Sequence, residues 1–160
     1  MSTSESSPQS APERRSAEAD LRALVAKFAH ANERLIATAR RWLRKRLPTA
    51  SEIVYEYRDC FVISYSPNEQ GYAGVFALRG SAEGVRLYFN QGKGLSDPEK
   101  LLQGSGGLVR WIPLEGPSTL KSAPVLSLFE TALARNPVPF ARTGRGPIFV
   151  RSTAAKKRQR

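Results

Sequence analysis

The residues whose types and spacing point most directly to chemistry are clustered cations. The run "RRWLRKR", residues 40–46, places five cations around Trp42 and Leu43, and "KKRQR" follows at residues 156–160. Cations beside an aromatic side chain on a helix, and a basic terminus, can neutralise phosphates and bind nucleic acid with little sequence preference. The alternative is a solvated basic surface. The predicted nucleic-acid contacts are Arg40, Arg41, Arg44, Lys45, Lys156, Lys157, Arg158 and Arg160.

A second set of polar and aromatic residues falls on predicted strands. Its members are Tyr55, Tyr57, Tyr88, Asn90 and Arg110. If the strand register brings them together, they form a shallow groove with aromatic walls and a few hydrogen-bond donors. Such a groove suits a small molecule or a protein segment, and the alternative is an ordinary exposed sheet face.

The residue types that catalysis needs are scarce. His30 is the only histidine and Cys60 the only cysteine, so no internal disulfide and no multi-cysteine metal site can form. Glu52 and Glu56 stand at alternate positions of a strand, where they are either a carboxylate pair or part of a solvated strand edge. No nucleophile-elbow pattern is present. We therefore expect a protein that is not an enzyme and needs no cofactor.

The elements that must position these residues begin with a helical region. Apolar residues recur every three or four positions over residues 17–47, which is typical of amphipathic helix. The weaker stretch "HANE", residues 30–33, predicts a break with Asn32 as the cap. Pro48 ends the helical pattern.

After Pro48 the period of the sequence becomes two. We expect strands at "EIVYEY", "CFVISYS", "GVFALR", "VRLYFN" and "LVRWIPL", followed by a last helix from Ser122 or Ala123. The alternation in "VRLYFN" indicates that only one sheet face is buried. The predicted fold is α+β: an antiparallel five-stranded sheet with one face covered by N- and C-terminal helices.

A glycine-rich run separates the last two of these strands. Ser96, Asp97, Pro98 and Glu99 have the pattern of a capping box and predict a short helix that ends at Gly104. The glycines are either a phosphate cradle or a connector. We favour a connector, because a phosphate-binding loop needs its glycines before a helix and a Gly-Lys-Ser/Thr ending.

Charge and composition divide the chain into three parts. Residues 1–16 are rich in Ser and Pro and are predicted to be disordered, residues 17–136 to form one domain, and residues 137–160 to be a flexible basic tail. The net charge of +11 lies mainly in the helical region and the tail, since residues 137–160 carry seven Lys/Arg and no acid. No apolar stretch reaches the length of a membrane span or a secretion signal, so we expect a cytoplasmic protein without a membrane partner.

The region around residues 35–134 also resembles a known family. Leu47-Pro48, Ala50, Glu52 and Val54-Tyr55, then Phe89, Gly92, Leu95, Asp97-Pro98, Leu101-Leu102, Gly104, Gly106 and Arg110, resemble the hallmark of the YdhG-like family of bacterial domains of unknown function. The resemblance implies an α+β fold related to frataxin and, as an alternative function, iron binding or chaperoning. Because the cations of residues 40–46 would repel a metal ion, we expect first a non-catalytic binding module whose basic tail contacts nucleic acid.

Overall fold

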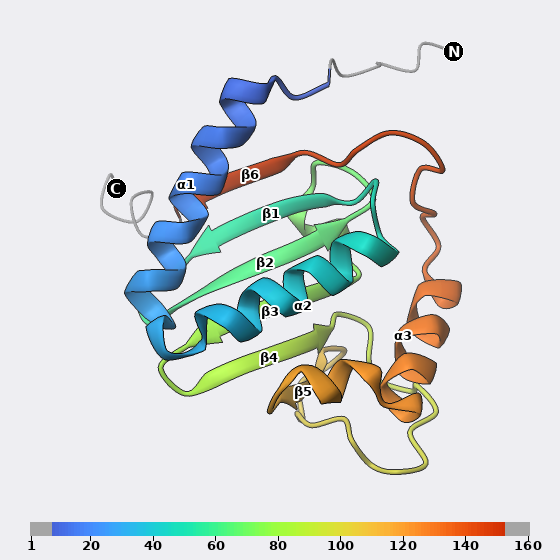
Figure 1. Ribbon diagram of the computed structural model, residues 1–160. Coiled ribbons are helices and arrows are strands. Elements are labelled where there is room, and N and C mark those ends of the chain that lie inside the picture. Colours follow the sequence, from blue (N-terminus) through green and yellow to red (C-terminus); the bar gives the residue numbers. More distant parts are fainter. Residues whose placement is uncertain (1–7, 153–160) are drawn as a thin grey trace.

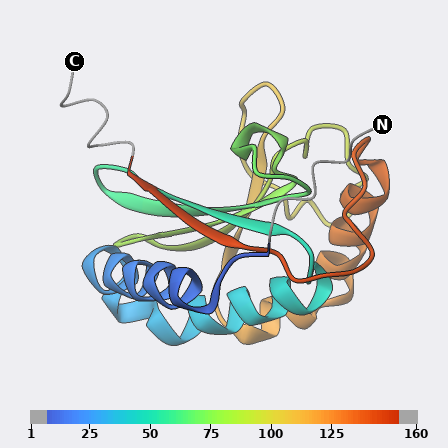
Figure 2. The same cartoon turned by 90° about the horizontal axis from the view of Figure 1, so that it is seen from above.

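A computed structural model describes residues 8–152 and shows a six-stranded sheet with two helices across one of its faces and a third helix beside one end of it (Figures 1 and 2). The helices are α1 (Ala11–Phe28), α2 (Glu33–Arg46) and α3 (Ala123–Arg135). The strands are β1 (Ser51–Glu56), β2 (Cys60–Ser66), β3 (Phe76–Ser81), β4 (Gly84–Phe89), β5 (Arg110–Leu114) and β6 (Ile148–Ser152). Three short 3-10 turns, η1 (His30–Asn32), η2 (Gly71–Ala73) and η3 (Pro117–Lys121), lie between them.

The sheet has the strand order β5-β4-β3-β2-β1-β6. Strands β1 to β5 pair antiparallel, whereas β6 pairs parallel to β1. The α+β class is confirmed, but the predicted five antiparallel strands are wrong, because the sheet is mixed and has a sixth strand.

The sixth strand comes from the segment predicted as a tail. Ile148 is fully buried, and its backbone N–H and C=O both bond to the side-chain amide of Gln9, at 3.0 and 2.7 Å. Just before it, Gly146 passes so close to β1 that a Cβ there would collide with the carbonyl oxygen of Ala50. These contacts come from distant parts of the chain, so local periodicity could not reveal the strand.

The core fills the space between the helices and the sheet. Alternate residues of each strand face the helices, so that in β4 the buried positions are Val85, Leu87 and Phe89. From α3, the ring of Phe129 stacks on Phe76 at 4.2 Å between ring centroids. This packing fixes the helices, and therefore their polar faces, relative to the strands. Among residues 8–152, no helix has the length and apolar character needed to cross a bilayer.

The helical region is divided where the sequence predicted. Helix α1 ends at Phe28 and α2 begins at Glu33, with Asn32 in the cap position but without a side-chain capping bond. However, α1 begins at Ala11, inside the segment predicted to be disordered. Ser10 caps it and forms a capping box with Glu13, whose side chain reaches back to the cap.

The glycine-rich run connects β4 to β5, but the short helix predicted there is absent from the structure of these residues. The Asp97 carboxylate instead accepts bonds from the N–H groups of Leu101 and Leu102, at 2.9 and 2.8 Å. Lys100 adopts a left-handed backbone conformation with φ of 56°, so the turn does not continue into a helix. The predicted helix was therefore wrong, and the bonds of this turn are those of the Asp97 carboxylate and not those of a capping box between Ser96 and Glu99.

Candidate anion-binding site

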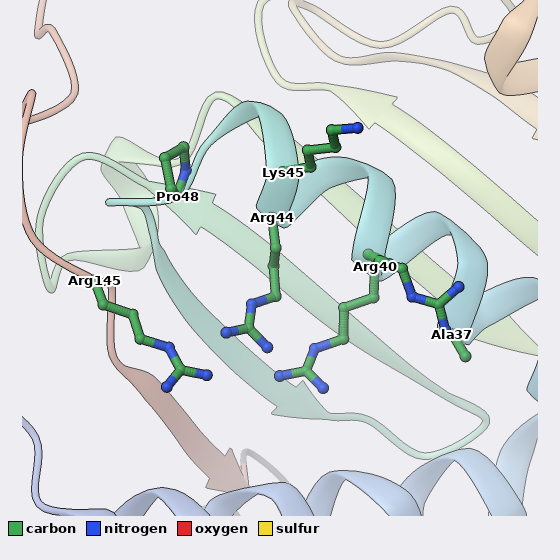
Figure 3. A pocket seen from close by; sticks show the side chains of 7 residues that line it. Ala37, Arg40, Arg44, Lys45, Pro48 and Arg145 are labelled. Carbon is green, nitrogen blue, oxygen red and sulfur yellow. The ribbon is translucent and has the colours of Figure 1, made fainter.

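A strongly cationic hollow lies beside α2, on the helix-covered side of the sheet. It has a volume of about 590 Å³ and is open to solvent. Figure 3 shows the side chains of Arg40 and Arg44 from α2 and of Arg145 from the segment before β6 directed into the same space. We call this hollow the arginine groove; its lining residues are Ala37, Arg40, Arg41, Arg44, Lys45, Pro48 and Arg145.

A buried ion-pair network adjoins the arginine groove and shares Arg40 with its lining. Arg40 donates to the Glu52 carboxylate on β1 at 2.8 and 2.9 Å, and to the Glu18 carboxylate on α1 through two bonds of 2.6 Å. The buried Tyr65 hydroxyl also donates to Glu52, at 2.9 Å. Glu52 is only 2% exposed. A carboxylate at such a position is stable only with hydrogen-bonded partners, so this network is first of all structural.

The ionisation of the network follows from these contacts. Burial opposes the charge of Arg40, but its hydrogen bonds to Glu18 and Glu52 outweigh burial and raise the pKa of the guanidinium. The bond from Arg40 lowers the pKa of Glu18. Burial, and then the charge of Glu52, raises the pKa of Tyr65 well above its ordinary value. Arg40 thus stays charged, and its ion pair with Glu18 persists at neutral pH.

Beyond this network the groove holds positive charge in excess. Arg44 lies 3.7 Å from Glu18 and 3.5 Å from Glu52, oxygens that already accept bonds from Arg40. Within residues 8–152, the Nε and Nη2 atoms of Arg14 are buried without a hydrogen-bond partner, although Nη1 donates to the Gly146 carbonyl at 2.9 Å. Burial, then the nearby charges of Arg44 and Arg145, lowers the pKa of Arg14. Two guanidinium donors of Arg14 are therefore buried close to other cations without an acceptor.

The four cations of α2 that were predicted to contact nucleic acid differ in their contacts. All four line the groove, but Arg40 is bonded to Glu18 and Glu52. Arg44 makes only the longer contacts of 3.7 and 3.5 Å to the same carboxylates, and Arg41 and Lys45 are exposed. The predicted contacts Lys156, Lys157, Arg158 and Arg160 lie outside the described residues.

The five residues of the predicted sheet groove are not brought together. Tyr88 is on β4 and Tyr55 on β1, with β2 and β3 between them. Tyr57 lies beside Tyr55, at 6.4 Å between ring centroids, and is partly exposed. The Asn90 amide donates to the Gly74 carbonyl, and the Arg110 guanidinium to the carbonyls of Gly106 and Val109.

Three residues of the site were missed by sequence reasoning. Arg14 and Arg145 belong to segments predicted to be unstructured, and Glu18 was predicted only as part of an amphipathic helix. The solvated-edge interpretation of Glu52 was wrong, because β1 lies between β2 and β6 and the carboxylate points toward the helices. Glu56 does not join it in a carboxylate pair and instead binds Lys27 at 2.8 Å.

Two further findings bear on the function. The described residues contain no group of three or more His, Cys, Asp or Glu side chains that could hold a metal ion, and iron binding stays an untested alternative. No family model matches the chain, and no curated protein or solved structure matches it either. The resemblance to the YdhG-like family therefore stays a prediction, and the function must be argued from the site itself.

Proposed function

We propose that this chain is a non-catalytic binding module whose arginine groove holds phosphate groups of nucleic acid. The observation that carries the proposal is the convergence of Arg44 and Arg145, from two different segments, on one open hollow, with the guanidinium of Arg14 buried close by. An anion in the groove would offset the repulsion among these three guanidinium groups.

The donor chemistry favours a phosphate. A guanidinium presents several N–H donors in a planar fork that matches two oxygens of a phosphate. Arg44 and Arg145 come from two different segments, α2 and the stretch before β6, and line the same hollow. They can therefore approach one phosphate from different sides, which a single row of cations on one helix cannot do.

The shape of the site favours phosphates of a polymer. The hollow is open to solvent, and the exposed cations Arg41 and Lys45 also line it. When one phosphate of a nucleic acid lies in the groove, the neighbouring phosphates of its backbone can contact these two exposed cations. The predicted contacts at the basic C-terminus, residues 156–160, would add to the same electrostatic attraction.

Binding of a labelled nucleic acid, followed by fluorescence anisotropy over a series of salt concentrations, tests this proposal. The variant is R44Q/R145Q, and its matched control is R34Q/K121Q, which removes the same charge at exposed residues outside the groove lining. We expect the groove variant to lower affinity and to flatten the plot of log K against log salt by about 0.7–0.9 for each phosphate that it no longer neutralises. Equal effects of the two variants would overturn the proposal.

A further inference from the structure

The face of the sheet that the helices leave open carries a distinct set of side chains. In Figure 2, α1 and α2 lie on one side of the sheet and α3 stands beside one end of it, while loops and the short 3-10 turn η2 lie on the other side. Because side chains alternate along a strand, the residues between the buried positions of β4 point to this open face. They are Arg86 and Tyr88, both half-buried.

Two arginines lie directly opposite each other on this face. Arg79 of β3 and Arg86 of β4 are register partners. Arg79 bonds only to the Ser81 hydroxyl, at 3.3 Å, among the contacts within residues 8–152. Arg86 lies 3.6 Å from the carboxylate of Glu83, which is 73% exposed. Like charges at opposed positions destabilise a sheet, so an anion between these two guanidinium groups would stabilise it.

Aromatic rings continue the same surface. Tyr88 pairs in register with Trp111 of β5, with the ring centroids 6.3 Å apart. The guanidinium carbon of Arg86 lies 3.9 Å from the centroid of the Trp111 ring. Nucleic-acid bases stack on aromatic rings and on arginine planes. We call Arg79, Arg86, Tyr88 and Trp111 the sheet platform.

The charge of the open face is of one sign. The register of the six described strands places Arg79, Arg86 and Arg151 on this face and no carboxylate among their residues. Tyr72 of η2, which is 90% exposed, stands in the loop over Tyr55 at the other end of the face. An acidic polymer with flat, unpaired rings complements such a surface better than a duplex, whose bases are already stacked on each other.

We infer that the sheet platform is a second binding site, which takes the unpaired bases of a single-stranded nucleic acid. This inference rests on the ligand class of the proposed function and narrows it to single strands, but it uses residues on the opposite side of the sheet from the arginine groove. Trp111, Tyr88 and the plane of Arg86 stack with bases, while Arg79 and Arg86 neutralise phosphates between them.

The test compares three probes with the full chain. They are a short oligothymidylate, an abasic oligomer with the same number of phosphates, and a polyglutamate peptide of the same charge. We expect the oligothymidylate to bind most tightly and, in a W42F background, to quench the emission of Trp111. Equal affinity for all three probes would show that charge alone is recognised, or that the face suits an acidic protein segment, and would overturn the inference.

Substitutions within the sheet platform show which of its residues bind the oligomers. Removal of one stacking ring by W111A should weaken oligothymidylate binding about 5- to 150-fold while leaving the abasic oligomer nearly unchanged. W111F, which keeps an aromatic ring and guards against a loss of folding in W111A, should retain most of the affinity. R86Q should weaken binding of both oligomers. An unchanged affinity of W111A for oligothymidylate would refute the stacking role.

The two proposals can fail separately. If R44Q/R145Q leaves binding unchanged but W111A abolishes the preference for bases, the platform stands and the arginine groove is not a nucleic-acid site. If R44Q/R145Q alone lowers affinity and no probe distinguishes bases from abasic sugars, the groove stands and the inference about the platform is wrong.

Discussion

Replacement of Arg40 by methionine should destabilise the protein strongly. Met fills a similar volume but removes the bonds of 2.8 and 2.9 Å to Glu52, which leaves a carboxylate that is 2% exposed with the Tyr65 hydroxyl as its remaining close donor. Arg44, at 3.5 Å, can compensate for part of the loss. Loss of one partner of a buried ion pair typically costs about 3–5 kcal/mol. For a chain of this size, that corresponds to a melting temperature lower by roughly 6–20 °C.

Urea unfolding followed by far-UV circular dichroism measures this cost. A double-mutant cycle of R40M, E52Q and R40M/E52Q isolates the coupling, because E52Q removes the charge that R40M would leave unpaired. The double variant should therefore lose less stability than the sum of the single variants. R41M is the control, since Arg41 is exposed on the neighbouring position of α2 and should change stability by less than about 0.5 kcal/mol. The reasoning is refuted if R40M costs no more than R41M, or if the cycle is additive.

Two further predictions concern stability. The pKa of folded Glu18 lies below its ordinary value of 4.5, so its pairing with Arg40 stabilises the fold above that pH and is lost as pH falls through the lower folded-state value. Urea unfolding should therefore show a shallower loss of stability below pH 4.5 in E18Q than in the parent and in the exposed-site control E99Q; parallel curves would contradict this. I148A should cost about 2–5 kcal/mol in the same assay, against little for V138A at a 45% exposed site, and similar costs would mean that β6 is not part of the folded sheet.

Local patterns predicted most of the fold. The break at residues 30–33, the β2 strand Cys60–Ser66 and the start of the last helix at Ala123 all depend on the periodicity or capping of neighbouring residues. The sixth strand and the first turns of α1 were missed because they depend on contacts between residues that are far apart in the sequence. Each occupies a short segment rich in Pro, Gly or Ser, and they hold each other in place through Gln9 and Ile148. A contact between residues at the two ends of the chain leaves no periodic signal in either.

The candidate site was predicted only in part, for the same reason. The cations of α2 stand out in the sequence, but nothing local indicates that Arg40 lies opposite Glu52 and is neutralised there. Arg14 and Arg145 could be recognised as site residues only after α1 and the segment before β6 were placed beside α2. Composition therefore indicated that the chain carries excess positive charge, and the tertiary structure showed which of these charges lack a partner.

The most direct test of the arginine groove observes its guanidinium groups while an anion binds. Nitrogen-15 NMR of the arginine Nε–Hε groups, titrated with inorganic phosphate and then with a short oligonucleotide, reports on each side chain separately once single Arg→Lys variants have assigned the signals. We expect the signals of Arg44 and Arg145 to shift together with one saturating dependence on ligand, while that of exposed Arg34 stays nearly constant. If Arg34 shifts as much as the two groove residues, or if neither groove residue responds, the groove is not the anion-binding site.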